Sequence, residues 1–170
     1  IMKTPVIVDA VRTPIGRAHP ERGYFRNVRG DSLAVACVEA ILQRTNLPPA
    51  EIEDVLFGCT QQTLEQGMNI SRGIALMAGA PISSAAATIN RLCGSSLQAI
   101  NQAAHAIIAG AEDVQIVGGL EHMQHLPMDH GLDVNPQLYR VTSRGAVHMG
   151  ITAEFLAQTS GISRQEQDQF

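Results

Sequence analysis

The sequence predicts an α/β domain in which buried strands alternate with helices. Apolar runs such as 6–8 and 55–57 lack regular polar alternation, which is typical of strands covered on both faces. Between such runs, apolar residues recur at helical spacing. Residues 85–119 combine a strand, a helix and a second strand, and this order indicates a parallel sheet with crossover helices.

The first two elements are a strand and a helix. Val6, Ile7 and Val8 predict a central strand of the sheet. Asp31 or Ser32 is placed to cap the helix that follows, and the Asn-Leu-Pro-Pro stretch at 46–49 ends it. The helical spacing predicts a core-facing stripe made of Leu33, Ala36, Cys37, Ala40 and Ile41.

The remaining elements are short strands and helices that glycine and proline separate. In chain order they are a strand at 54–58, a helix at 69–79, a strand at 85–90, a helix at 94–110 and a strand at 114–119. The long helix carries His105, which we expect to be a partly exposed helix histidine rather than a general base. Its predicted core face consists of Leu97, Ile100, Ala104, Ile107 and Ile108.

Composition excludes several classes of partner. With 12 basic and 16 acidic residues the net charge is −4, which gives no basic surface for nucleic acid. No apolar stretch reaches the roughly 20 residues that a membrane-spanning helix needs. The three cysteines are odd in number and widely spaced, so a disulfide framework is not indicated. We therefore expect a cytoplasmic protein without nucleic-acid partner or membrane span.

Cys93 is the residue that most directly suggests chemistry. It lies in the turn between the strand at 85–90 and the long helix, at the sheet edge where ligand sites of α/β proteins gather. The amides of Gly94 and Ser95 would lie at the helix N-terminus, where they favour a thiolate and an oxyanion. A reactive thiol and a buried packing cysteine both remain open from position alone. Cys37 and Cys59 are interpreted as structural.

Other site chemistries are weakly supported. His122, His125 and His130 lack the carboxylate or cysteine that would complete a familiar metal-ligand set, so no metal is expected. The turn after residues 6–8 has no Gly-x-Gly-x-x-Gly pattern for a dinucleotide. The sequence around Cys93 has no Gly-x-Ser-x-Gly elbow of a serine hydrolase.

Four motifs in order resemble the thiolase family, over nearly the whole chain. They are VIVDAVRTPIG at 6–16, NRLCGSSLQAI at 90–100, GGLEHM at 118–123 and HMGITAE at 148–154. Two further stretches, CTQQTLEQGMNISR and EHMQHLPMDHG, are most similar to the bacterial 3-ketoacyl-CoA thiolases that form the β-subunit of the fatty-acid oxidation complex.

The resemblance implies an acyltransferase of fatty-acid β-oxidation. Cys93 would attack the 3-keto carbon of a 3-ketoacyl-CoA, release acetyl-CoA and hold the shortened acyl chain as a thioester until a second CoA removes it. Coenzyme A is then a substrate, and no cofactor is expected. The same cysteine chemistry also serves the biosynthetic condensation of two acetyl-CoA units, which is one alternative.

The resemblance also implies roles for particular residues and partners. His148 and Met149 match loop residues that border the reacting end of the substrate. Gln66, Asn69 and Arg72 match a segment at the dimer interface. The subfamily implies a homodimer and a heterotetramer with a multifunctional α-subunit, whereas His125 and His130 fit its pattern without a physical role.

The implied fold is the five-layered α/β/α/β/α arrangement of thiolases, of which this chain would be the N-terminal half with a mixed sheet. We expect an N-terminal α/β domain over 1–120 and part of a loop domain over 121–170. The family's Asn-Glu-Ala-Phe, Gly-His-Pro and Cys-x-Gly motifs do not occur. A helix starting at the Ser163–Glu166 capping box has no stop signal. The second alternative is therefore a catalytically silent, truncated chain that exposes an apolar face and aggregates or dimerises.

Overall fold

A computed structural model describes residues 3–170 as two compact units. The units are Ile1–His130 and Gly131–Phe170, so the division falls after residue 130 rather than after 120. His122 and Leu126 explain the difference, because both side chains are buried against the first unit. The segment at 121–130 is therefore part of the packed α/β unit.

A three-stranded parallel sheet forms the centre of the first unit. The strands are β1 (Asp54–Gly58), β2 (Ala85–Ile89) and β3 (Gln115–Gly119), in the spatial order β2-β1-β3. All three runs were predicted as strands, and this prediction is confirmed. The resemblance implied a mixed sheet, but the strands in the described residues are all parallel, because β1 pairs with β2 and with β3 in the same direction. Helical crossovers connect such parallel strands.

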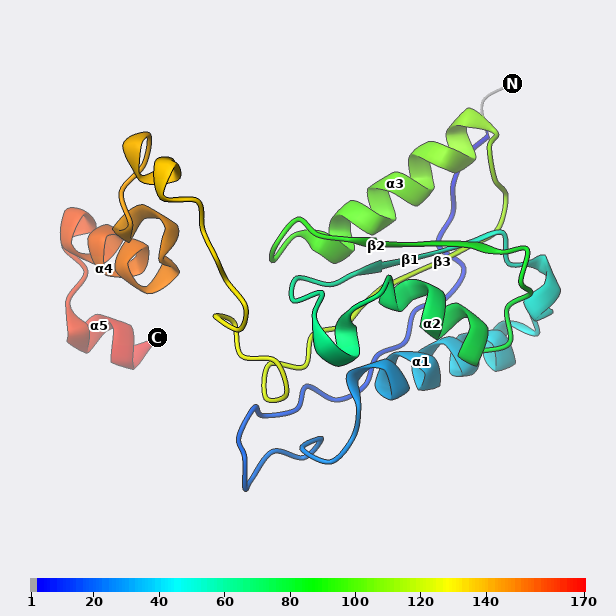
Figure 1. The fold of residues 1–170 in the computed structure, drawn as a ribbon, viewed down its shortest axis with the longest axis horizontal. Helices are drawn as coiled ribbons and strands as arrows, with labels where there is room; N and C mark the ends of the chain where they lie inside the picture. Colours follow the sequence, from blue (N-terminus) through cyan, green and yellow to red (C-terminus); the bar gives the residue numbers. More distant parts are fainter. Residues whose placement is uncertain (1–2) are drawn as a thin grey trace. The chain divides into compact units, whose positions relative to one another are not determined.

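Helices cover both faces of this sheet (Figure 1). On one face lie α1 (Gly30–Thr45) and α2 (Ile70–Met77), and on the other lies α3 (Ser95–Ala109). Asn46 ends α1 and Gly110 ends α3, each in the left-handed conformation that is typical of helix C-termini. Two single-turn 3₁₀ segments, Pro49–Glu51 and Leu64–Gln66, lie in the connections. The predicted helices are thus confirmed.

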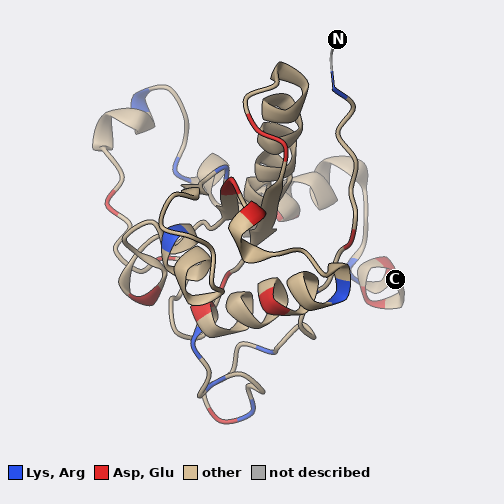
Figure 2. Ribbon diagram, turned by 90° about the vertical axis from the view of Figure 1, so that its right-hand side faces the viewer, with Lys and Arg blue, Asp and Glu red and all other residues tan. Residues whose placement is uncertain are grey.

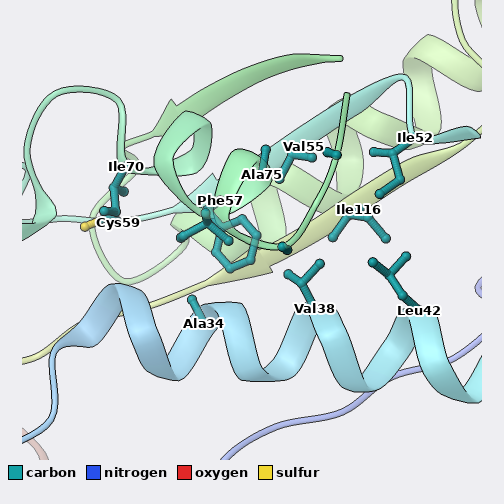
Figure 3. Packing of buried hydrophobic residues seen from close by; sticks show 13 residues of the cluster. Ala34, Val38, Leu42, Ile52, Val55, Phe57, Cys59, Ile70, Ala75 and Ile116 are labelled. Carbon is teal, nitrogen blue, oxygen red and sulfur yellow. The ribbon is translucent and has the colours of Figure 1, made fainter. Parts of the chain in front are cut away.

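The two helical layers pack on opposite sides of β1. Val55 and Phe57 point toward α1 and α2, whereas Leu56 points toward α3, as alternation along a strand requires. Figure 3 shows Val38 and Leu42 of α1 beneath the strands. The core on the α3 side is thinner and is built from Leu56, Ala99 and Ala103.

The predicted helix faces are wrong in detail. In α1 the buried apolar side chains are Ala34, Val38 and Leu42, one residue along from most of the predicted stripe, of which Ile41 packs partly buried against the same core. Asp31 does not cap this helix, because its carboxylate pairs with Arg29. In α3 small residues face the sheet, which allows close approach of the helix. The larger aliphatic side chains of the predicted face are therefore partly exposed to solvent, and Leu97 is 63% exposed.

The N-terminal segment does not form the predicted central strand. Val6, Ile7 and Val8 are 73–80% exposed, and within residues 3–170 the sheet ends at β3 on one side and β2 on the other. A strand needs a hydrogen-bonded neighbour for its backbone groups. Here the segment is held by ion pairs instead, from Arg44 to Asp9 at 2.8 Å and from Lys3 to Asp113.

The second unit is helical. It contains two 3₁₀ segments, Pro136–Arg140 and Gly145–Val147, and two α-helices, α4 (Met149–Ser160) and α5 (Arg164–Gln169). Ser163 and Glu166 form the predicted capping box at the start of α5. None of the helices in residues 3–170 is long and apolar enough to cross a membrane.

Charged side chains are dispersed along the ribbon. Figure 2 shows acidic and basic positions interspersed on the same elements rather than separated onto a basic stripe.

We predict that Ile74→Ala destabilises the fold far more than Leu76→Ala. Ile74 is 0% exposed within the core of α2, whereas Leu76 on the same helix is 46% exposed. Urea unfolding should show a loss of about 2–5 kcal/mol for the buried position. The exposed position should lose less than about 1 kcal/mol. Equal losses would contradict this assignment of the core.

Candidate active site

Cys93 lies in the turn that joins β2 to α3, at the edge where all three parallel strands end. Cys59 and Thr60 follow β1 at this edge, and Glu121 follows β3 closely. Figure 1 shows these connections at the same end of the sheet as the start of α3. The predicted position of Cys93 at the carboxyl edge is confirmed, and the residue is exposed.

The turn around Cys93 is tight and closed by backbone hydrogen bonds. Gly94 N donates to Arg91 O at 3.1 Å, and Ser95 N donates to Leu92 O at 3.0 Å. The Ser95 hydroxyl accepts from Arg91 N at 2.8 Å and donates to Leu92 O at 2.5 Å. Leu92 has φ +50°, a left-handed conformation that L-residues with bulky side chains rarely adopt. A strained residue therefore stands directly before the cysteine.

The structure gives the amides of Gly94 and Ser95 a different task from the one predicted. Sequence reasoning assigns them to an oxyanion at the helix N-terminus. In the structure their N–H groups are already used in closing the turn. Their observed contribution is to hold Cys93 next to the N-cap of α3, where the helix dipole favours negative charge.

Two glycines allow α3 to begin in contact with the sheet. A Cβ on Gly58 would overlap the backbone of Ser95 and Ser96 and would stand 2.7 Å from Ser96 Cα. A Cβ on Gly119 would overlap the Ser96 side chain. Both glycines are the last residues of their strands. The absence of side chains there sets how closely the N-terminus of α3, and the adjoining Cys93 turn, approaches the strand ends.

The three thiols differ sharply in their surroundings. Burial and then the negative charge of Glu121 raise the pKa of Cys59 to about 12, which keeps it protonated. Its sulfur accepts a hydrogen bond from Gln66 Nε2 at 3.2 Å. Cys37 is half-buried on α1. Cys93 is the exposed thiol of the three, so a dissolved substrate can reach it.

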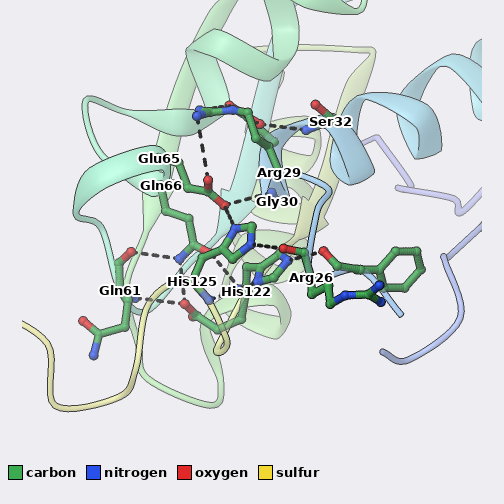
Figure 4. Close-up of polar contacts among 12 residues, drawn as sticks. Arg26, Arg29, Gly30, Ser32, Gln61, Glu65, Gln66, His122 and His125 are labelled. Carbon is green, nitrogen blue, oxygen red and sulfur yellow. Dashed lines mark hydrogen bonds and ion pairs between the residues drawn. The ribbon is translucent and has the colours of Figure 1, made fainter. Parts of the chain in front are cut away.

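A buried amide joins the loop after β3 to the turn after β1 (Figure 4). Gln66 is 0% exposed, and its Nε2 donates to Glu121 Oε1 at 2.7 Å and to Gln61 O at 2.9 Å. Its Oε1 accepts from His122 N at 2.7 Å. Glu121 also accepts from the amides of Thr60 and Gln61. These bonds hold the two loops together beside the turn that carries Cys93.

His125 forms an ion pair with Glu65 close to the hydrogen bonds of Gln66 (Figure 4). Its Nδ1 lies 2.9 Å from Glu65 Oε1 and its Nε2 lies 2.8 Å from Arg26 O. Acceptors at both ring nitrogens favour the doubly protonated imidazolium. The hydrogen bond to Arg26 O and then that to Glu65 raise the pKa of His125 above its ordinary value of 6.5.

The partners of His125 complete the cluster. Burial acts to raise the pKa of Glu65, but hydrogen bonds from His125 and the Gly30 amide outweigh it and hold that pKa below 4.5. Arg29 lies 3.7 Å from the second Glu65 oxygen. The His122 ring stacks on that of His125 with centroids 3.7 Å apart. His125 thus has a physical role that the sequence pattern did not reveal, whereas His130 is exposed.

The other predicted site residues are distributed over both units. His148 and Met149 are exposed at the start of α4 in the second unit, and their place beside the substrate stays a prediction. Asn69 is exposed beside β2, and its Nδ2 donates to Ala86 O at 2.9 Å. Arg72 donates to Ile82 O at 2.8 Å. Gln66 is wholly enclosed in its own chain, so its side chain has no surface with which to contact a partner.

Sequence reasoning missed the polar groups that hold this edge together. Glu65 and Glu121 are 55 or more positions from several of their partners, so no local spacing shows them. Glu121 lies within the quoted GGLEHM motif, which was a signal that it matters. Asn90 is likewise the first residue of the quoted NRLCGSSLQAI motif, which was a similar signal.

We predict that Gly58→Ala destabilises the protein and displaces the turn that carries Cys93, whereas Gly73→Ala does neither. A Cβ at Gly73 meets nothing within 4 Å. Overpacking at Gly58 should cost about 1–3 kcal/mol in urea unfolding. Because a Cβ at Gly73 meets open space, alanine there should be neutral or stabilise by up to about 1 kcal/mol. A neutral Gly58→Ala would show that α3 does not depend on this close contact.

The His125–Glu65 pair predicts a pH-dependent stability. The raised pKa of His125 makes its contribution full below about pH 6.5 and lost as pH rises through the folded-state value. The lowered pKa of Glu65 makes its contribution present above about pH 4.5 and lost in more acidic solution. The stability difference between the native protein and His125→Gln should therefore shrink from about pH 6 to about pH 8. A constant difference across that range would contradict the ion pair.

Comparison with known proteins agrees with this geometry. Residues 5–170 match the family described as thiolase, N-terminal domain. The chain is 53% identical to a 3-ketoacyl-CoA thiolase of Shewanella loihica, with 99% of this chain and 43% of that protein covered. It is 52% identical to a 3-ketoacyl-CoA thiolase of Aeromonas hydrophila subsp. hydrophila over the same shares. The chain thus spans less than half the length of these curated relatives.

A solved structure agrees as well. The crystal structure of the Bacillus anthracis acetyl-CoA acetyltransferase has a TM-score of 0.79 and 33% sequence identity, and the match covers 99% of this chain and 45% of that one. A family match over nearly the whole chain and the placement of Cys93 at the sheet edge lead to one conclusion: this chain belongs to the thiolase family, within its N-terminal domain.

Proposed function

We propose that the protein carrying this chain is an acyltransferase that cleaves 3-ketoacyl-CoA with CoA, through a thioester on Cys93. The observation that carries this proposal is the exposed thiol beside the N-terminus of α3, set in a strained turn at the carboxyl edge of the sheet. The names of the relatives, 3-ketoacyl-CoA thiolases at 52–53% identity, support this substrate class.

The reaction divides into two steps. In the first, the Cys93 thiolate forms a bond to the 3-keto carbon, and the former keto oxygen becomes an oxyanion. Collapse of the oxyanion breaks the C2–C3 bond, and the electron pair leaves as the enolate of acetyl-CoA, which takes up a proton. In the second, a deprotonated CoA sulfur attacks the thioester and releases the shortened acyl-CoA together with the Cys93 thiolate.

The N-terminus of α3 supports both steps, because its dipole stabilises the thiolate and the nearby oxyanion. The proposed reaction needs coenzyme A as substrate and no further cofactor. The thiolase resemblance assigns the proton transfers to a histidine and a second cysteine in motifs that this sequence does not contain. His148 and Met149 are proposed to border the reacting end of the CoA thioester, from the segment 121–170 of the loop domain.

The proposal includes an assembly and a compartment. Asn69 and Arg72, beside the open edge of β2, are candidate residues of a homodimer interface. A heterotetramer with a multifunctional α-subunit would follow from the subfamily. The three free cysteines agree with a reducing cytoplasm and a role in fatty-acid β-oxidation.

A second candidate is the condensation of two acetyl-CoA units. The structural similarity to the Bacillus anthracis acetyl-CoA acetyltransferase favours it. The same Cys93 thioester serves both directions. Assays with 3-ketoacyl-CoA plus CoA and with acetyl-CoA alone separate the two, and turnover in neither would support a catalytically silent chain.

We predict that acetyl-CoA leaves an acetyl adduct on Cys93 in the full gene product. Intact mass followed by peptide mapping should locate it. Cys93→Ala should abolish the adduct and lower thiolytic turnover by at least about 10³-fold, as expected on loss of a nucleophile.

Cys37→Ala is the matched control, since this thiol is half-buried on α1 and remote in sequence from the turn. It should keep both the adduct and turnover. An adduct that maps to Cys59, or turnover that survives Cys93→Ala, would overturn the assignment.

A further inference from the structure

Asn90 bridges two loops that no regular element connects. It is the first residue after β2 and is exposed. Its side-chain Nδ2 donates to Thr60 O at 3.0 Å, in the turn after β1. Its Oδ1 accepts from Leu92 N at 2.9 Å, in the nucleophile turn. One amide side chain thus ties the backbone before Cys93 to the neighbouring strand end.

The hydrogen bond from Leu92 N to Asn90 Oδ1 involves the strained residue of the turn. Leucine at φ +50° is unfavourable because its Cβ crowds the backbone, and such a conformation persists only where surrounding contacts hold it. The Asn90 side chain accepts from the amide of this very residue. Ser95 Oγ supports the same turn, because it accepts from Arg91 N and donates to Leu92 O.

The other end of the bridge is itself anchored. Glu121 accepts from Thr60 N at 2.8 Å and from Gln61 N at 3.3 Å, and Gln66 fixes the same carboxylate. Cys59 N donates to Ile89 O at 3.0 Å, which extends the pairing of β1 and β2 toward Asn90. A continuous hydrogen-bonded path therefore runs from the end of β3, through the turn after β1, to the amide of Leu92.

We propose that Asn90 is a positioning residue for Cys93: it holds Leu92 in its left-handed conformation and so keeps the thiol at the N-terminus of α3. Without the bridge, Leu92 relaxes to negative φ and the sulfur moves away from the helix start. This inference rests on the proposed function, because it assigns to Asn90 the alignment of the nucleophile in that reaction.

The test compares acylation rates of Cys93 in the full gene product. Native protein, Asn90→Ala and Asn90→Asp are mixed with excess acetyl-CoA, and the adduct is followed by intact mass. Displacement of the sulfur should slow acylation and lower kcat at least about tenfold in Asn90→Ala, with a smaller change in KM. Asn90→Asp keeps the acceptor for Leu92 N and loses the donor to Thr60, so its rate should lie between.

A second-site variant separates positioning from a general structural role. Glycine adopts positive φ without the penalty that leucine meets. Leu92→Gly should therefore restore a substantial part of the acylation rate when added to Asn90→Ala. Asn101→Ala, on the exposed side of α3, is the matched control and should acylate at the native rate.

The outcomes are distinct. Native acylation by Asn90→Ala, or a loss that Leu92→Gly does not recover, overturns the positioning role. Absence of an adduct in the native protein contradicts the proposed function instead. In that case the rate at which iodoacetamide alkylates Cys93 measures the reactivity of the thiol without acyl transfer. An alkylation rate that Asn90→Ala alters and Leu92→Gly recovers still supports the positioning role. If Asn90→Ala does not fold, the acylation rates of Asn90→Asp and of Asn90→Asp with Leu92→Gly are compared instead.

Discussion

The contact between the N-terminus of α3 and the ends of β1 and β3 is the constraint on which the rest of the structure depends. Gly58 and Gly119 leave no side chain between strand and helix, and the alanine face of α3 lets the helix lie close along its length. Because the helix cannot move away from this contact, the preceding turn is short and tight. The turn that this contact positions carries Cys93, which is exposed.

Two hydrogen-bonded clusters stabilise the same edge in different ways. The neutral amide of Gln66 is fully buried, so its bonds to Glu121, Gln61 and His122 are shielded from solvent. The charged pair of His125 and Glu65 lies closer to solvent and changes with pH. The Gln66 cluster holds the loop after β3 at Glu121 and His122. The pair of His125 and Glu65 connects the same loop to the start of α1, because Glu65 also accepts from Gly30 N.

The strands and helices between residues 30 and 119 were predictable because their signals are local. A buried run such as 55–57 and the glycine that ends α3 act over a few residues. The strand at 6–8 was predicted wrongly, since a strand also requires a neighbour, and its own residues do not specify one. The face of α3 was misassigned because large aliphatic residues were taken as core, whereas close packing favoured alanine. Cys93 was found from its turn, but Asn90, Glu65 and Glu121 act through partners distant in sequence.

The unequal burial of the three cysteines has a consequence for oxidative damage. Peroxides react with thiolates that solvent can reach, and a thiol held protonated inside the protein is inert toward them. Cys59 is 1% exposed and protonated well above neutral pH, whereas Cys93 is open to solvent. The exposure that the proposed reaction requires of Cys93 therefore also makes it the thiol that oxidants reach before the buried Cys59.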